Sequence, residues 1–239
     1  MRTIALTLIF ILISVRCTGQ HKAPPENNLQ LKREQMVKRQ IAARGITNTK
    51  VLSAMRKVER HLFVPEDKID DAYGDYAVPI GYGQTISQPY IVAFMTDILD
   101  VKRDTKVLEV GTGSGYQAAV MGEICDSVFT IEIIKPLAEK SRELLKKLGY
   151  RNVFVKIGDG YKGWPEYAPY DAIIVTCSPS HIPEPLVEQL AEGGKMVIPV
   201  GKLFNQELVL LVKNKGKLKQ QAILPVRFVP MVNEENQEY

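Results

Sequence analysis

The chain has 239 residues, of which 45% are hydrophobic and 24% charged, the ordinary composition of a soluble globular protein. Its 31 basic and 27 acidic residues give a net charge of +4, which is too small to require a nucleic-acid partner. The three cysteines, Cys17, Cys125 and Cys177, have neither the spacing of zinc ligands nor the even number of a disulfide framework, so we expect no metal site.

The first 28 residues differ from the rest of the chain. Residues 4–15 carry no charge, and this run has the length of a signal-peptide core rather than of a membrane span. Cys17 follows at the position of a lipoprotein cleavage site, although Arg16 stands where a small residue is usual. Residues 18–28 are polar and contain prolines, as a linker does. Residues 1–28 are therefore a cleaved signal, a lipid-anchored segment (residues 4–17) or an uncleaved extension, and the sequence leaves these alternatives open.

The next part of the chain, residues 29–100, predicts helices around a loop-rich stretch. Residues 61–90 contain most of its prolines and glycines and predict loops. The predicted helices cover 29–44, ending at Gly45; a segment capped by Asn48 and running through Lys57; and the buried segment Ile91–Leu99.

From residue 101 onwards, apolar runs of strand length alternate with stretches of helical period. This alternation is typical of βαβ units and a parallel sheet. Gly193-Gly194 should turn the chain into a later strand, and Asn214-Lys215-Gly216 should connect a β-hairpin. The predicted strands are 106–110, 128–133, 153–157, 171–176, 195–200, 207–213 and 218–229, and the predicted helices are 115–124, 135–148 and 183–191. The fold class is a doubly wound, mostly parallel α/β sheet with an N-terminal helical extension and a C-terminal antiparallel pair.

Residues 109–115 have the sequence Glu-Val-Gly-Thr-Gly-Ser-Gly and lie between a predicted strand and a predicted helix. Gly111, Gly113 and Gly115 would let the backbone approach a ligand, and the helix would turn its free N–H groups towards it. Glu132 follows about 20 residues later at the end of the next strand, where a ribose-binding carboxylate stands in such folds. The turn and the acid together predict a cofactor that contains adenosine.

The spacing of the glycines narrows the choice of cofactor. A dinucleotide fingerprint needs a glycine where Tyr116 stands, and no G-x-x-x-x-G-K-[ST] sequence occurs. Glu109, two residues before the first glycine, makes the segment resemble the first motif of S-adenosylmethionine-dependent methyltransferases. The glycines could still belong to a plain strand–helix turn, but Glu132 and Asp159 in register behind them favour the cofactor.

A second polar stretch, residues 81–90, has the sequence Gly-Tyr-Gly-Gln-Thr-Ile-Ser-Gln-Pro-Tyr ahead of a buried helix. Functional side chains concentrate on such loops. Ser87 could cap the following helix or belong to a site, and the residues alone do not separate these two roles.

From about residue 30 on, the chain resembles the protein-L-isoaspartate O-methyltransferase family. The loop Gly-Gln-Thr-Ile-Ser-Gln-Pro is highly specific to that family, whereas the glycine-rich turn is generic. The chain departs from the family in its N-terminal extension and at Cys177, where alanine is usual. The segments that carry the resemblance are Arg44-Gly45-Ile46, residues 60–65, 83–89 and 109–115, Gly158-Asp159-Gly160, Gly163-Trp164-Pro165 and residues 169–176.

The resemblance implies a reaction. The methyl group of S-adenosylmethionine would pass to the free α-carboxylate of an L-isoaspartyl or D-aspartyl residue, and the ester would close to a succinimide and allow repair. A carboxylate is already ionised at pH 7, so catalysis needs placement and exclusion of water rather than a strong base. The implied partners are isoaspartyl proteins and peptides, with no nucleic acid. We expect a monomer in the cytoplasm, where the cofactor is made.

The resemblance also assigns the site residues. Ser87 matches the family's active-site serine, with Thr85 beside it, and residues 226–231 resemble the segment that closes over the substrate. Glu132 should accept from both ribose hydroxyls, and Asp159 with Gly160 should meet the adenine edge. The cofactor residues are Glu109, Gly111, Thr112, Gly113, Gly115, Glu132, Asp159 and Gly160. They belong to one methyltransferase domain over 29–239, with a helical and active-site extension at 29–100 and the cofactor-binding core at 101–239.

Three other functions remain as alternatives. A base-modifying nucleic-acid methyltransferase would carry a polar-Pro-Pro-aromatic motif where residues 176–179 read Thr-Cys-Ser-Pro, and would show a basic patch with aromatics. A binding module without activity is disfavoured by the intact loop around Ser87. An NAD-dependent oxidoreductase is disfavoured by Tyr116. His61 is a tempting base, but we expect it to be structural because the reaction removes no proton.

Overall fold

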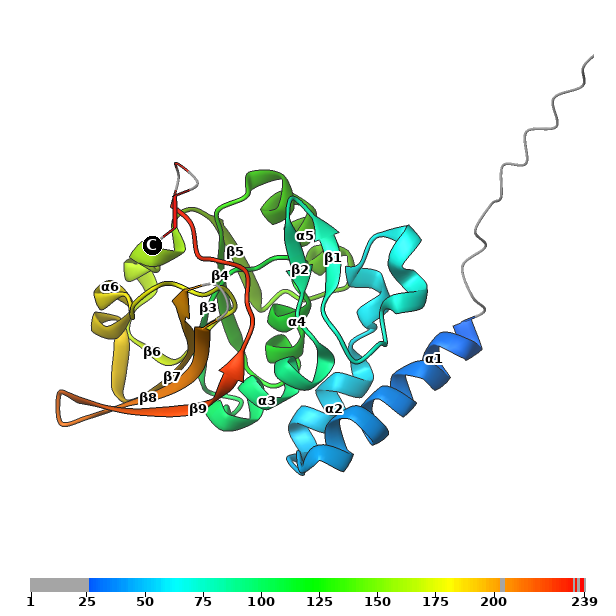
Figure 1. The fold of residues 1–239 in the computed structure, drawn as a ribbon, viewed down its shortest axis with the longest axis horizontal. Helices are drawn as coiled ribbons and strands as arrows, with labels where there is room; N and C mark the ends of the chain where they lie inside the picture. Colours follow the sequence, from blue (N-terminus) through cyan, green and yellow to red (C-terminus); the bar gives the residue numbers. More distant parts are fainter. Residues whose placement is uncertain (1–25, 203–204, 234, 236, 239) are drawn as a thin grey trace, which may run out of the picture.

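A seven-stranded sheet forms the centre of the protein in the computed structural model, which describes residues 26–202, 205–233, 235 and 237–238 (Figure 1). The strand order is β5-β4-β3-β6-β7-β8-β9; the first five of these strands are parallel, and β8 and β9 are antiparallel. The strands are β3 (Lys106–Val110), β4 (Ser127–Glu132), β5 (Val153–Ile157), β6 (Tyr170–Val175), β7 (Leu190–Lys202), β8 (Asn205–Asn214) and β9 (Lys217–Val226). The predicted α/β fold with a C-terminal antiparallel pair is confirmed.

The central strands are continuous apolar runs because both faces of the sheet are covered. Successive residues of β3 show this: Val107 faces a core shared with α2 (Thr49–Lys57) and with α3, α4 and α5, and Leu108 faces a second core that includes α6 and an aromatic cluster. The helices are α3 (Pro89–Leu99), α4 (Tyr116–Gly122), α5 (Lys135–Lys147) and α6 (Glu184–Glu188). The strand order reverses between β3 and β6, and ligands bind at the carboxyl ends of strands beside such a reversal.

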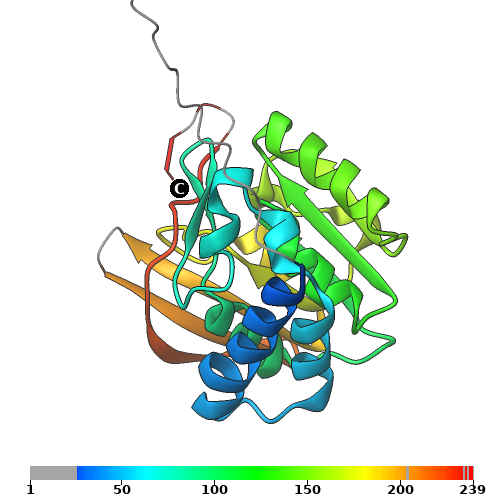
Figure 2. The same ribbon diagram turned by 90° about the vertical axis from the view of Figure 1, so that its right-hand side faces the viewer.

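The N-terminal extension is helical and packs on the first core (Figure 2). The predicted helix over 29–44 is present as α1 (Glu26–Gln35), a π-helical turn (Met36–Ile41) and a 3₁₀ turn (Ala42–Arg44), and it ends at Gly45, whose φ is 96°. The predicted cap of α2 (Thr49–Lys57) is also confirmed, because Asn48 Oδ1 accepts from Lys50 N at 3.1 Å. Helix α1 starts at Glu26, within the segment 1–28 that the sequence set apart; Cys17 and residues 4–17 lie outside the described residues.

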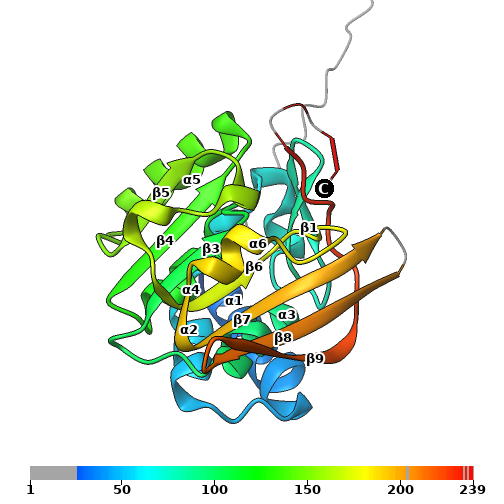
Figure 3. The ribbon, with the colours of Figure 1, turned by 90° about the vertical axis from the view of Figure 1, so that its left-hand side faces the viewer.

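The stretch predicted as loops contains a small hairpin, β1 (Val78–Gly81) and β2 (Gln84–Ile86), and two 3₁₀ turns, Arg60–Phe63 and Glu66–Asp71. The hairpin escaped prediction because its strands are only three or four residues long and Pro79 lies inside the first. In Figures 1, 2 and 3 the chain after β9 runs beside this hairpin. The first third of the chain and its last segment therefore meet at the carboxyl ends of the central strands.

Most predicted strand boundaries differ from the observed ones by one or two residues, and the start of β7 and the end of β9 differ by more. Gly193-Gly194 does not precede β7 but lies inside it, at an irregularity in the pairing with β6. A Cβ at residue 194 would lie 2.9 Å from the Ala191 carbonyl oxygen and 3.0 Å from that of Asp171, so only glycine fits between the strands. Strand β9 ends at Val226 rather than at residue 229, which frees the following residues to cross the end of the sheet. No helix in the described part of the chain is long and apolar enough to span a membrane.

Candidate active site

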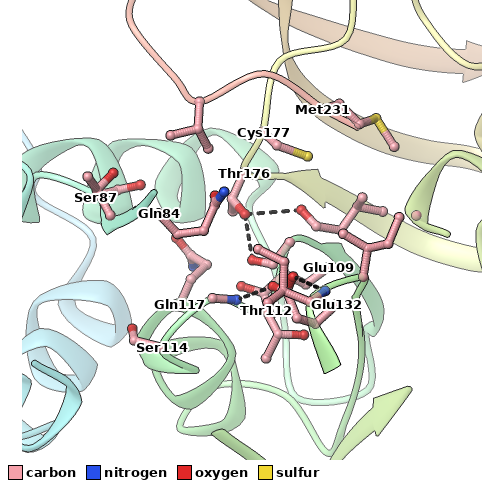
Figure 4. Close-up of a pocket in the computed structure, with 18 of the residues that line it drawn as sticks. Gln84, Ser87, Glu109, Thr112, Ser114, Gln117, Glu132, Thr176, Cys177 and Met231 are labelled. Carbon is pink, nitrogen blue, oxygen red and sulfur yellow. Dashed lines mark hydrogen bonds between the residues drawn. The ribbon is translucent and has the colours of Figure 1, made fainter. Parts of the chain in front are cut away.

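A pocket of about 800 Å³ opens at the carboxyl ends of β3, β4 and β6 (Figure 4). The glycine turn, the end of β4, the hairpin and the chain after β9 provide its walls. Of the residues predicted from the sequence, eight line the pocket: Thr85, Ser87, Glu109, Gly111, Thr112, Gly113, Glu132 and Gly160. Gly115 and Asp159 do not line it. Gly115 packs behind the turn against Leu145, and buried Asp159 caps a 3₁₀ turn (Gly160–Lys162) by accepting from Tyr161 N at 2.9 Å.

The glycine turn needs its glycines, because φ is 98° at Gly111, 53° at Gly113 and 86° at Gly115. The Gly111 and Thr112 N–H groups donate to the Ile131 carbonyl at 2.8 and 3.1 Å, so the turn is tied to β4. These two N–H groups at the start of the turn are thus used within the protein. The main effect of the glycines is that a ligand can come close to the backbone of the turn.

Glu132 at the end of β4 is buried and holds the backbone on two sides. Its Oε2 accepts from Gly113 N at 2.8 Å and its Oε1 from Ile134 N at 2.9 Å. Burial raises the pKa of Glu132, and the hydrogen bonds from the backbone oppose that rise. Each carboxylate oxygen has a second lone pair, so Glu132 can anchor the turn and still accept from a ligand hydroxyl.

Glu109 is fully buried beneath the turn. Its Oε2 accepts from Thr130 Oγ1 at 2.5 Å, and Thr130 Oγ1 lies 2.7 Å from Thr112 Oγ1. Glu109 Oε1 has no hydrogen-bond partner among the residues that the structure describes. Burial raises the pKa of Glu109 to about 8. Among the described lining residues there is no lysine, arginine or histidine to balance Glu109 and Glu132. Two carboxyl groups without a basic partner suit a ligand that carries positive charge.

Ser87 lies between β2 and α3, and its interpretation as a helix cap is wrong. The N-cap of α3 is Gln88, which makes no side-chain cap bond, and the half-buried Ser87 hydroxyl has no hydrogen-bond partner within the described ranges. Thr85 on β2 is exposed. The loop itself is fixed by Gln88 Nε2, which donates to Asp75 Oδ1 at 2.8 Å, and by the ion pair of Asp75 with Arg44.

A second cavity, of about 1090 Å³, runs from this loop along residues 225–229. It shares four lining residues with the first pocket: Thr85, Ser87, Thr176 and Val229. A ligand in the pocket and a chain in the groove would therefore meet at these four side chains.

The sequence did not assign Thr176, although its place directly after β6, beside β3, is a signal for a site residue. Cys177 also lines the pocket, and burial raises the pKa of its thiol. His61 does not line the pocket; its Nδ1 lies 2.8 Å from Tyr73 Oη beneath the N-terminal helices.

The reversal of strand order at β3, the glycine turn and the anionic pocket define a class I S-adenosylmethionine-dependent methyltransferase. The chain belongs to the protein-L-isoaspartate(D-aspartate) O-methyltransferase family, whose model matches residues 31–236. Its cofactor is S-adenosylmethionine, and the pocket fits that cation because Glu132 is a buried carboxylate with no lysine, arginine or histidine beside it among the described lining residues.

Relatives and solved structures agree with this assignment. A protein-L-isoaspartate O-methyltransferase of Opitutus terrae is 52% identical over 230 residues, 96% of this chain and 97% of the relative. One of Synechococcus is 54% identical over 207 residues, 84% of this chain and 85% of the relative. A solved protein-L-isoaspartate O-methyltransferase has a TM-score of 0.78 at 28% identity over 84% of this chain and 66% of its own. A putative one from Plasmodium falciparum, in complex with S-adenosyl-L-homocysteine, has a TM-score of 0.73 at 28% identity, over 83% of this chain and 97% of its own.

We predict that Glu132→Ala weakens binding of S-adenosylhomocysteine through two separable effects. Loss of the anchor on Gly113 loosens the turn, and loss of each charge-assisted hydrogen bond to the ribose costs about 1.5–3 kcal/mol. Calorimetric titration with S-adenosylhomocysteine and with an analogue lacking the ribose 2′-hydroxyl separates the two. The analogue should bind the wild-type protein more weakly than the parent ligand does, and the two ligands should bind the variant alike. If the analogue loses the same affinity relative to S-adenosylhomocysteine in both proteins, Glu132 does not bind the ribose.

We predict that Glu109→Gln changes how thermal stability depends on pH. The folded protein keeps the Glu109 proton up to a pKa of about 8, whereas the ordinary pKa of a glutamate side chain is 4.5. Between these values the folded state binds more protons than the unfolded state does, so wild-type stability falls as pH rises. The variant lacks this titration, and its Tm relative to wild type should rise between about pH 5 and pH 8. Exposed Glu139→Gln is the control. A Tm difference that does not change with pH would contradict the prediction.

Proposed function

We propose that this protein transfers the methyl group of S-adenosylmethionine to the free α-carboxylate of L-isoaspartyl and D-aspartyl residues in damaged proteins. The observation that carries the proposal is the meeting of two cavities at Thr85, Ser87, Thr176 and Val229. The pocket is closed in by the glycine turn and is anionic, as a sulfonium cofactor requires. The groove runs from the loop around Ser87 along residues 225–229, where a peptide substrate could lie.

The reaction needs no base. One oxygen of the substrate carboxylate forms a bond to the methyl carbon, the carbon–sulfur bond breaks, and its electron pair stays on sulfur; no proton moves. A carboxylate with a pKa near 4 is already ionised at neutral pH. The protein's contribution is to place the carboxylate in line with the methyl group and to exclude water.

The side chains at the junction fit this task. The Ser87 hydroxyl has no hydrogen-bond partner in the described part of the chain, so it can donate to the carboxylate or to the substrate backbone, with the Thr85 hydroxyl nearby in the same wall. Glu132 accepts from the ribose hydroxyls, and Asp159 with Gly160 lies toward the adenine. In this assignment Asp159 acts through its position behind the pocket wall, since it caps the turn that begins at Gly160.

The substrate class is tested by transfer of a tritiated methyl group to an isoaspartyl peptide and to its normal aspartyl isomer. Methylation of the isoaspartyl peptide alone is expected. Activity on a nucleic acid or on a small molecule, with none on the isoaspartyl peptide, would favour another class I methyltransferase. The partners are then isoaspartyl proteins and peptides, and we expect the enzyme to act as a monomer.

We predict that Ser87→Ala lowers kcat/KM by about tenfold or more while Tm and affinity for S-adenosylhomocysteine stay unchanged. Donors aimed at a reacting oxygen typically contribute about 10²–10³-fold in rate, and an acceptor that is already anionic gains less from them. Ser53→Ala, at an exposed position of α2, is the matched control. Near-normal kcat/KM in folded Ser87→Ala would exclude Ser87 from the reaction.

We further propose that the enzyme works in the cytoplasm, because its cofactor is made there. Fractionation of the full-length protein and labelling with palmitate measure this directly. We expect a protein in the soluble fraction without label. Recovery in the membrane fraction with palmitate on Cys17 would instead establish a lipid-anchored protein.

A further inference from the structure

The glycine turn between β3 and α4 presents a physical difficulty. Glycines at residues 111, 113 and 115 permit close approach to the cofactor, but each also leaves its peptide groups unusually free to rotate. A loop that must be ordered on binding costs affinity. Two hydroxyl groups from separate elements contact the carbonyl groups of this turn.

The first hydroxyl belongs to Thr176, directly after β6. Its Oγ1 lies 2.7 Å from the carbonyl oxygen of Gly111 and 3.0 Å from that of Val110, and its N–H also donates to Val110 at 2.9 Å (Figure 4). A Cβ at residue 111 would clash with this hydroxyl, so Thr176 Oγ1 fills the space that the missing side chain leaves. A hydroxyl has one hydrogen to donate, and the Thr176 hydroxyl donates it to a backbone carbonyl oxygen. Thr176 is therefore not a second donor to the substrate beside Ser87.

The second hydroxyl belongs to Ser141, in the middle of α5. Ser141 is buried, and its Oγ lies within hydrogen-bonding distance of the Gly113 carbonyl oxygen and 2.8 Å from that of Leu137. Helix α5 supports the turn from behind: a Cβ at Gly115 would lie 3.2 Å from Leu145 Cδ1 and 3.5 Å from Ser141 Cβ. Ser141 does not line the pocket, so its effect on a ligand passes through the turn.

We propose that Thr176 and Ser141 are positioning residues that clamp the carbonyl groups of Gly111 and Gly113 and hold the turn in its cofactor-binding shape before the cofactor arrives. Glu132 completes the clamp by accepting from the N–H of Gly113. Three side chains from β4, α5 and the end of β6 thus fix peptide groups that glycine leaves free. The proposal rests on the placement of the cofactor at this turn.

The test uses full-length Thr176→Val, which keeps the side-chain shape, Thr176→Ser, which keeps the hydroxyl, and Ser141→Ala. The control is Ser178→Ala, which removes a buried hydroxyl that contacts the Gly201 carbonyl of β7 at 3.1 Å and not the turn. Calorimetric titration with S-adenosylhomocysteine should show affinity lower by about tenfold in Thr176→Val and in Ser141→Ala, because a carbonyl clamp is lost. Thr176→Ser and Ser178→Ala should bind as wild type does.

Kinetics and hydrogen exchange separate positioning from general stability. In Ser141→Ala the KM for S-adenosylmethionine should rise with little change in the KM for the isoaspartyl peptide, and amide exchange over residues 111–116 of the free enzyme should become faster. Thr176→Ala replaces Thr176→Val if the latter does not fold. Wild-type affinity, within twofold, in both clamp variants would overturn the clamp. Failure of the wild-type protein to bind S-adenosylhomocysteine would instead overturn the placement of the cofactor.

Discussion

The turn after β3 has to come close to its ligand and keep one shape, and these two requirements conflict. Close approach demands residues without side chains, whereas a single shape demands contacts that side chains usually supply. The structure resolves the conflict by taking the contacts from neighbours: Ile131 accepts from the start of the turn, and Glu132 accepts from Gly113 N. The order β4-β3-β6 is what places these neighbours, because it brings the ends of three strands beside the turn.

Charge imposes a second constraint at the same place. Glu109 is buried with one oxygen that has no partner within the described ranges, which is unfavourable, and the cost is lowered when the carboxyl group stays protonated. Glu132 differs, because two backbone N–H groups stabilise its anion although it is nearly as buried. The pocket thus holds one carboxylate stabilised by the backbone and one carboxyl group whose charge depends on its surroundings. A cation at this position compensates for both, and the neutral thioether left after methyl transfer carries one positive charge fewer than the sulfonium.

The sequence predicted the sheet better than the site. Strands 106–110 and 153–157 have the predicted bounds because they are short apolar runs between clear breaks. The hairpin β1–β2 escaped prediction because its strands are only three or four residues long and Pro79 lies inside the first. The pair Gly193-Gly194 predicts a turn, but the structure needs glycine at residue 194 because β6 and β7 approach closely there. Ser141 had no signal at all: it stands in a strongly charged helix whose buried face only the fold reveals.

The role of Ser87 illustrates what sequence chemistry alone does not decide. A serine two residues before the proline that starts a helix is a reasonable cap, and the same hydroxyl is a reasonable site donor. The structure decides between these roles because Gln88, and not Ser87, occupies the N-cap position of α3. The side-chain amide of Gln88 donates to Asp75 instead of capping the helix. Asp75 is in turn held by Arg44 at the end of the N-terminal helices. The helical extension therefore acts on the site through this chain of contacts, which fixes the loop. The Ser87 hydroxyl, which lies where the two cavities meet, is left without a hydrogen-bond partner among the described residues.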